Sequence, residues 1–472
     1  MRQTKRKIAQ FTFYDRTGIQ KLLEKEAQKG WLLEKISSWG WKFRRIEPAN
    51  IKYAVTYFPQ ASMFDPEPTE KQKNFWDLCE HTGWRLASHN AQMQIFYNER
   101  ENPIPIETDA AIELENIESS AKKSFLVSYY LLTVCTVLQI ALGIWQYFTD
   151  PVKFLSRNSN LFSALCWSFL MAMCLIEIIG FFSWRHKARK AIEETGGFTA
   201  TKGYRNIELA FMWVILDIFA VFLVSIGGKM AVFSVISASA IALIASLVWG
   251  LSNLLKKFKV SANANRIITI IVTIAMSFGV TGFLLITVID KAMEGGWFDR
   301  EYAYTYEYNG HTFKVYDDEL PLMLQDMITT DYDGYSTSWY GDESIFMSSH
   351  NAYQRPKIGD FEQYGLEYTL VKVKVPFLYN IAYRNMLKDF VNNRGMTEDD
   401  EFYERAVEVP ASEWGAQKAY QLYKGEDYAS SEYLLCYEDS IIEFNPDMEM
   451  EITKEVKAAV AEKIGGVAVC YD

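Results

Sequence analysis

The sequence predicts a multi-domain membrane protein with a cytoplasmic α+β domain containing an antiparallel sheet, an all-α bundle of five transmembrane helices, and an extracytoplasmic α+β domain. Three observations predict this organisation. Long apolar runs are confined to residues 124–289. The polar segments on either side carry helix and strand periodicities. Lys and Arg are concentrated in alternate loops between the apolar runs, which indicates an orientation in the bilayer.

The apolar runs are long enough to cross a bilayer. A hydrocarbon core about 30 Å thick needs roughly 20 apolar residues in a helix, and core helices of soluble proteins rarely run that long without charge. We predict spans at residues 124–148, 161–184, 208–226, 230–253 and 267–289. Only a few residues around Gly227 and Gly228 join the third and fourth spans, so the sequence leaves open whether both cross fully.

Basic residues gather on one side of these spans. The 185–207 loop holds six Lys and Arg residues, and the 254–266 loop holds four. The other two loops together hold three. Since positively charged loops stay in the cytoplasm, we expect residues 1–123 inside a bacterial cell membrane and residues 290–472 outside it.

The N-terminal domain, residues 1–100, contains a repeated pattern of helix, Gly-Trp and strand. A helical periodicity over 17–29 ends at Gly30-Trp31, and a second over 69–81 ends at Gly83-Trp84. Each pair precedes strand-like runs, at 32–37, 41–46, 51–58, 85–89 and 92–97. We interpret Gly30, Trp31, Gly83 and Trp84 as structural turns, because Gly permits the left-handed backbone that ends a helix. The alternative is a functional use of aromatics, in which Trp39 and Trp41 form a face for a protein partner.

These motifs resemble a known family. The pattern KGW after an amphipathic helix, the aromatic strand IKYAVTYF, the segment LCEHTGW and the closing strand MQIFYNE resemble domain-of-unknown-function family 2812 over residues 5–100. Members are bacterial, often continue into membrane helices, and often lie beside genes for PadR-type transcriptional regulators. The resemblance implies a bacterial membrane protein tied to regulation or stress response, and it implies no catalytic residues.

The remaining segments divide into a linker and an outer domain. Asn102-Pro103-Ile104-Pro105 marks the domain boundary, so residues 101–123 form a linker and an acidic juxtamembrane helix. Within 290–472, alternating tyrosines before Asn309-Gly310 predict a β-hairpin. Further strands are expected at 366–375, 419–423, 431–437 and 441–444, with helices at 377–392 and 452–464. The tyrosines either pack a sheet against its own helices or form a glycan-contacting surface.

Charge and cysteine usage limit the function classes. Residues 291–472 hold 16 Lys and Arg against 35 Asp and Glu. Such an acidic surface repels phosphate backbones, so we expect no nucleic-acid binding. The six cysteines lack metal-binding spacing. Cys436 and Cys470 share the outer domain, where they form either a disulfide or two unpaired thiols.

No motif in the chain indicates catalysis, a cofactor or a metal, so we expect a non-enzyme. The candidate functional residues are two acids in predicted spans, Glu177 and Asp217. A central Asp costs about 2.5–3.5 kcal/mol on insertion, so an intramembrane acid is a functional hypothesis by default. Each would move protons or hold a cation. Alternatively, each hydrogen-bonds a neighbouring helix and only stabilises the bundle.

The leading hypothesis is therefore a bacterial membrane protein of signalling, regulatory or envelope-sensing type. Its outer domain would be coupled through the bilayer-embedded helices to a cytoplasmic domain that contacts a protein partner. The alternative is a transporter, or an accessory subunit of one, that uses Glu177 and Asp217. The sequence does not identify the ligand, the partner or the oligomeric state.

Overall fold

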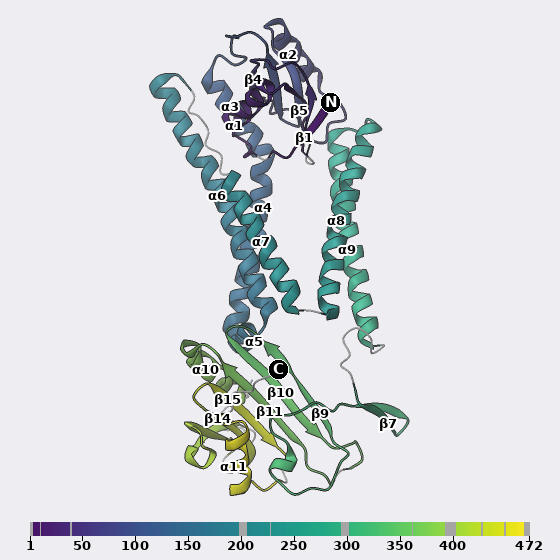
Figure 1. The fold of residues 1–472 in the computed structure, drawn as a ribbon, viewed down its shortest axis with the longest axis vertical. Helices are drawn as coiled ribbons and strands as arrows, with labels where there is room; N and C mark the ends of the chain where they lie inside the picture. The colour runs from purple at the N-terminus through teal and green to yellow at the C-terminus, as the bar shows by residue number, and fades with distance from the viewer. Residues whose placement is uncertain are drawn as a thin grey trace. The chain divides into compact units, whose positions relative to one another are not determined.

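The computed structural model describes residues 3–9, 11–37, 40–197, 205–226, 228–293, 302–360, 362–391, 403–425, 428–447 and 450–466. The chain forms two compact units (Figure 1). One comprises Met1–Gln139 and Cys166–Glu294, and the other comprises Ile140–Leu165 and Gly295–Asp472. The segment that joins the first two predicted spans therefore belongs to the same unit as the C-terminal residues.

The N-terminal part of the first unit contains two antiparallel sheets of three strands each, in the orders β1-β3-β2 and β4-β6-β5. The strands of the first sheet are β1 (Thr4–Lys7), β2 (Trp31–Lys35) and β3 (Trp41–Arg45). Those of the second are β4 (Lys52–Tyr57), β5 (Arg85–Asn90) and β6 (Met93–Asn98). The predicted strands are confirmed as elements, and β1 is an additional strand that the sequence analysis did not identify.

Two helices cover these sheets, α1 (Arg16–Gln28) and α2 (Glu70–His81). Both begin where predicted because a side chain caps them: Asp15 accepts from the backbone N–H of Gly18, and Thr69 from that of Gln72. Beyond their ends, Gly30 and Gly83 have φ of +80° and +91°. Both glycines thus adopt the left-handed conformation in which other residues are strained.

The core of this part extends beyond the sheets. Ile19 and Leu23 of α1 pack with Phe43, Tyr53 and other buried side chains of the two sheets. The next helix, α3 (Ala110–Lys123), adds Leu114, Ile117 and Ala121 to the same core. Helix α3 coincides with the predicted acidic juxtamembrane helix.

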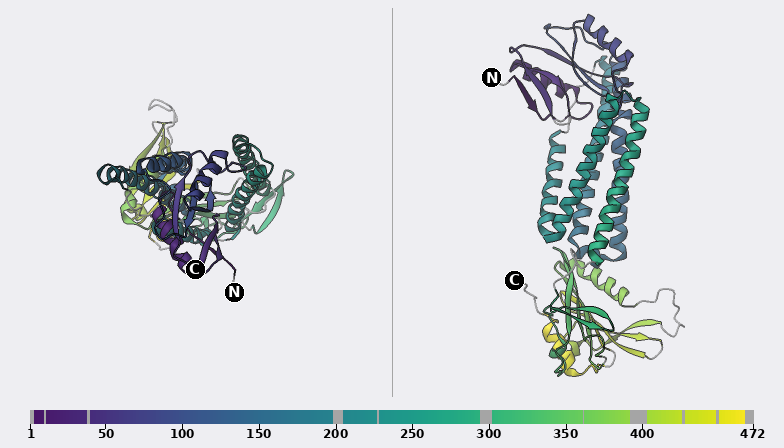
Figure 2. Two further views of the ribbon diagram at one scale, coloured as in Figure 1. Left: turned by 90° about the horizontal axis from the view of Figure 1, so that it is seen from above. Right: turned by 90° about the vertical axis from the view of Figure 1, so that its right-hand side faces the viewer.

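Four helices in the described part of the chain are long and apolar enough to cross a membrane (Figure 2). They are α4 (Phe125–Thr149), α6 (Asn158–Thr195), and the apolar parts of α8 (Gly228–Lys257) and α9 (Ala262–Met293). The third predicted span, 208–226, falls in α7 (Arg205–Ile226), whose described apolar stretch is the shorter Leu209–Val224. A bundle of five spans and the sidedness of the termini therefore stay predictions.

The second unit is built on a seven-stranded antiparallel sheet in the order β12-β13-β14-β15-β11-β10-β9 (Figure 1). Its strands are β9 (Ser336–Glu343), β10 (Met347–Arg355), β11 (Leu366–Val373), β12 (Glu404–Val409), β13 (Lys418–Lys424), β14 (Tyr428–Cys436) and β15 (Ser440–Pro446). Side chains alternate between the two faces. Ile442 and Phe444 share one core with α11 (Lys454–Lys463), whereas Ile441 and Val371 share another with α10 (Tyr379–Phe390).

A separate hairpin precedes this sheet. Strands β7 (Tyr304–Tyr308) and β8 (His311–Val315) pair in antiparallel fashion through Asn309-Gly310, both of which have positive φ. The predicted hairpin is confirmed. The ring of Tyr306 stacks on that of Phe313, while Tyr304 is exposed.

Candidate functional site

The site with the most developed contacts surrounds a short helix, α5 (Pro151–Ser156), between α4 and α6. The helix begins because Asp150 accepts a hydrogen bond from the backbone N–H of Lys153 and Pro151 occupies the first turn. Val152 and Leu155 then project into the core that contains Val371. Leu155 is only 8% exposed. An amphipathic turn between two apolar helices thus becomes part of the second unit's core.

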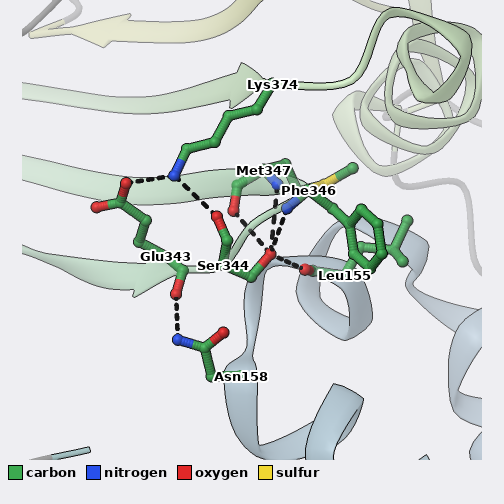
Figure 3. A network of polar contacts seen from close by, with 7 residues as sticks. All are labelled: Leu155, Asn158, Glu343, Ser344, Phe346, Met347 and Lys374. Atoms are coloured by element: carbon green, nitrogen blue, oxygen red, sulfur yellow. Dashed lines mark hydrogen bonds and ion pairs between the residues drawn. The ribbon is translucent and has the colours of Figure 1, made fainter. Parts of the chain in front are cut away.

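Polar contacts fix the end of α5 against the turn between β9 and β10 (Figure 3). The Ser344 hydroxyl donates to the carbonyl oxygen of Leu155 at 2.5 Å and accepts from the backbone N–H of Phe346 at 3.0 Å. Asn158 Nδ2 donates to the carbonyl oxygen of Glu343 at 2.9 Å. The Lys374 ammonium pairs with the Glu343 carboxylate and donates to the Ser344 carbonyl oxygen at 2.8 Å. The β9–β10 turn is therefore bonded both to the end of α5 and the start of α6, through Leu155 and Asn158, and to the sheet, through Lys374 after β11.

Two further contacts bind the same segment to the sheet unit. Arg157 Nε lies 2.6 Å from Asp342 Oδ2, and both side chains of this ion pair are half-exposed. The backbone N–H of Val152 donates to Asn385 Oδ1 of α10 at 3.3 Å. Asn385 in turn donates to Asp389 at 2.8 Å, which orients its amide. We call α5 with these contacts the α5 seat.

The α5 seat was not predicted, because residues 149–160 lie between two predicted spans and were expected only to connect them. The contacts join segments far apart in the chain, so no local pattern reveals them. The available signal was the capping pair Asp150-Pro151 followed by the apolar residues Val152, Phe154 and Leu155. That pattern indicates a short helix with a buried side.

A second contact region lies within the first unit, where α6 meets the N-terminal sheets and α3. The buried carboxylate of Glu118 in α3 pairs with two cations of α6, Arg185 at 2.5 Å and Arg189 at 3.0 Å. The ring of Tyr14 stacks on that of Trp184, with centroids 5.0 Å apart. Phe181 meets the edge of the same Tyr14 ring at 5.5 Å. The core of the N-terminal domain thus continues onto α6.

The two predicted intramembrane acids lie in different environments. Glu177 of α6 is 3% exposed, and its Oε1 has no hydrogen-bond partner among the described residues. Asp217 lies on an exposed side of α7. Within the described chain no hydrogen bond or ion pair joins the two. The structure therefore does not bring them into one site.

The structure describes one residue of the predicted aromatic face, Trp41, and one cysteine of the predicted disulfide, Cys436. Trp41 is 5% exposed and packs against Phe11, with ring centroids 5.6 Å apart. Its expected exposure is wrong, because Trp41 lies on the inner side of β3 together with Phe43. Trp39 and Cys470 lie outside the described residues. Cys436 is buried in β14. Because Cys470 is not among the described residues, a disulfide between the two stays a prediction.

The two Gly-Trp pairs lie where helices end. The ring of Trp31 is faced by the Arg45 guanidinium at 5.0 Å, and Trp84 Nε1 donates to the carbonyl oxygen of Ile104 at 2.7 Å. The second contact ties the repeat to the linker after residue 100. Across the described ranges, no group of three or more His, Cys, Asp or Glu side chains is arranged to hold a metal ion.

Residues 15–129 match the model of a family described as Protein of unknown function (DUF2812). The match confirms the resemblance over this segment. It begins at the cap of α1, includes strands β2 to β6 and helix α3 but not β1, and ends in the first turns of α4. No curated protein and no solved structure matches the chain.

Proposed function

We propose that this protein is a bacterial membrane protein of signalling or regulatory type, in which α4 and α6 couple the sheet domain of the second unit to the N-terminal domain. The observation that carries the proposal is the α5 seat. It attaches the end of α4 and the start of α6 to a sheet formed by residues 336–446. A loop needed only to connect two spans would not require a place in that core.

The contacts of the α5 seat are strong enough to transmit a change. Burying an aliphatic side chain such as Val152 or Leu155 contributes about 1.5–3 kcal/mol. A hydrogen bond such as that from Ser344 adds about 0.5–1.5 kcal/mol. A ligand that alters the packing of β9, β10 or α10 would therefore act on both helices at once. Helix shifts of about 1–2 Å are a common form of such coupling.

The contacts between α6 and the N-terminal domain are where this domain would respond to a movement of α6. Glu118 is a buried carboxylate whose two partners, Arg185 and Arg189, both belong to α6. A shift or rotation of α6 would change the distances in this group and the stacking of Trp184 on Tyr14. The N-terminal domain would then expose or withhold a surface for a protein partner in the cytoplasm. The basic loops 185–207 and 254–266 support this orientation.

This proposal assigns no catalytic step to the protein. Its support is the absence of nucleophile, phosphate-loop and metal-ligand motifs from the sequence. The coupling is testable without knowledge of the ligand. Allosteric coupling is reciprocal in free energy, so a perturbation at either contact region should be measurable at the other.

The test compares two Leu→Ala variants of the full chain in lipid nanodiscs by hydrogen exchange and mass spectrometry. Leu155→Ala should loosen the α5 seat by about 2–5 kcal/mol, the usual cost of a buried leucine. Leu138→Ala is the matched control, because Leu138 lies on α4 and is 59% exposed. We expect Leu155→Ala, unlike the control, to change amide exchange in α3 and α1 as well as in β9 and β10.

The reciprocal variant is Glu118→Gln, which should alter exchange around α5. If both variants change exchange only in the unit that contains the substitution, the coupling proposal is wrong. The alternative, a transporter or accessory subunit, has one observation in its favour: the buried Glu177 side chain, whose Oε1 has no hydrogen-bond partner among the described residues. Among the described residues no hydrogen bond or ion pair joins Glu177 to Asp217, so a shared ion site has no support from contacts between them.

A further inference from the structure

The first unit contains a large open cavity between its N-terminal sheets and its long helices. The cavity has a volume of about 1450 Å³. Most small-molecule sites measure about 300–1,000 Å³. This space is therefore large enough for a ligand with long acyl chains. Its lining includes neither Glu118 and its two arginine partners nor any residue of α5, so it is separate from the coupling contacts described above.

One side of the cavity is an apolar wall made by the helices. Val127 of α4, Met212 of α7 and Ile270 of α9 line it, opposite Phe11 and Trp41 of the N-terminal domain. Val127 is 58% exposed. Water against such a wall would cost free energy in proportion to the apolar area. Val127 and Ile270 belong to helices long and apolar enough to cross a membrane, and Met212 belongs to the shorter apolar stretch Leu209–Val224, so acyl chains of the bilayer are the natural material to cover the wall.

The other side is closed by the segment 58–64, which follows β4. Lys123, at the end of α3, donates from Nζ to the carbonyl oxygen of Pro59 at 3.2 Å. At the start of α9, Asn265 Nδ2 donates to the carbonyl oxygen of Phe64 at 3.3 Å. The guanidinium of Arg266 lies over the Phe64 ring, 5.6 Å from its centroid. The segment is thus pinned from two helices at the edge of the apolar wall.

Two cations at this edge lack an acidic partner. Lys123 and Arg266 both line the cavity, and in the described part of the chain neither forms an ion pair with a carboxylate. Both are exposed. They lie next to spans 124–148 and 267–289, on the side that the positive-inside rule assigns to the cytoplasm. Basic pockets between membrane helices at that level bind anionic lipid head groups.

We propose that this cavity binds an anionic phospholipid of the bilayer, with its acyl chains against Val127, Met212 and Ile270 and its phosphate between Lys123 and Arg266. The apolar wall selects a lipid over free phosphate, since free phosphate would leave the wall uncovered. The two cations select an anionic lipid over a zwitterionic one. Bound lipid would fill the space between the N-terminal domain and the helices.

The test measures lipids retained by the full chain with native mass spectrometry, after exchange into detergent with equal phosphatidylglycerol and phosphatidylcholine. We expect the wild type to retain phosphatidylglycerol preferentially. Each basic residue near a membrane surface contributes about 1 kcal/mol, so the double variant Lys123→Gln, Arg266→Gln should weaken phosphatidylglycerol binding by about 30-fold. Lys257→Gln is the charge control, because Lys257 is an exposed cation at the end of α8, shortly before α9 begins, that does not line the cavity.

A second pair of variants tests the wall independently of charge. Val127→Trp should fill part of the cavity and reduce retention of both lipids. Val137→Trp, at a comparably exposed position of α4 outside the cavity, should retain them. Equal losses in Lys257→Gln and the double variant would mean general attraction to a basic surface and would overturn the proposal. So would displacement of the lipid by millimolar inorganic phosphate, or full retention in Val127→Trp.

Discussion

Glu443 in β15 should make the stability of the second unit depend on pH. Its side chain is half-buried on the face of the sheet that α10 covers, with Ile441 on the same face. Burial raises the pKa of the Glu443 carboxyl to about 7, and the nearby carboxylates of Glu432, Asp389 and Glu367 add to the rise. Of these carboxylates, Glu432 pairs with the Lys424 ammonium at 3.4 Å. We therefore consider the substitution Glu443→Gln.

The magnitude follows from the pKa rise. A rise from 4.5 to about 7 corresponds to about 3 kcal/mol, at about 1.4 kcal/mol per pKa unit. The folded state binds the proton more tightly than the unfolded state, so it loses stability as pH rises. The loss is absent well below pH 4.5, grows between about pH 4.5 and 7, and is complete above about pH 7. Glu443→Gln should remove this loss.

The assay is hydrogen exchange of β11, β14 and β15 in the full chain, corrected for the intrinsic rate at each pH. Relative to wild type, Glu443→Gln should gain about 3 kcal/mol of protection at pH 8 and under about 1 kcal/mol at pH 5. The control is Glu438→Gln, an exposed acid in the β14–β15 turn. An equal difference between variant and wild type at both pH values would refute the reasoning.

Two further predictions concern the first unit. Gly30→Ala should destabilise the N-terminal domain by about 1–3 kcal/mol, because φ is +80° and an added Cβ would lie 2.8 Å from the Ile46 carbonyl oxygen. Thermal unfolding checks this against Gly197→Ala, where φ lies outside the left-handed region and the nearest atom to an added Cβ, Thr195 Oγ1, is at an ordinary contact distance of 3.6 Å. Glu177→Leu should raise the unfolding temperature in nanodiscs, because a buried polar group without a partner costs about 1–3 kcal/mol. A fall would mean that Glu177 holds an ion or partner, as the transport alternative requires.

Much of the fold could be predicted because its signals are local. The spans at 124–148 and 267–289 coincide with α4 and α9 within a few residues, since length and apolar composition determine insertion. The Gly-Trp pairs were recognisable because glycine commonly takes the left-handed conformation that ends a helix. The Asn309-Gly310 hairpin was predictable for a similar reason, as its turn needs two residues with positive φ.

The remaining features depend on contacts between distant segments. Trp41 lies in the strand predicted at 41–46, but the sequence does not show which side of that strand is buried; the pairing of β3 between β1 and β2 places its ring in the core. Likewise, nothing near residue 155 indicates that the Ser344 hydroxyl will donate a hydrogen bond to the carbonyl oxygen of Leu155 at the end of α5. The cavity requires α4, α7 and α9 to enclose a space with segment 58–64, and apolar runs do not specify such an arrangement.

The α5 seat also has a consequence for how the chain is made. Val152 and its partner Asn385 are separated by 233 positions, so α5 is synthesised long before the strands and the helix that cover it. Closing so long a loop is entropically slow and usually late in folding. A chain interrupted before residue 336 would leave Val152 and Leu155 without their core. We expect such products to be recognised by quality-control proteases, and residues 295–472 expressed without α5 to expose the apolar surface that α5 covers.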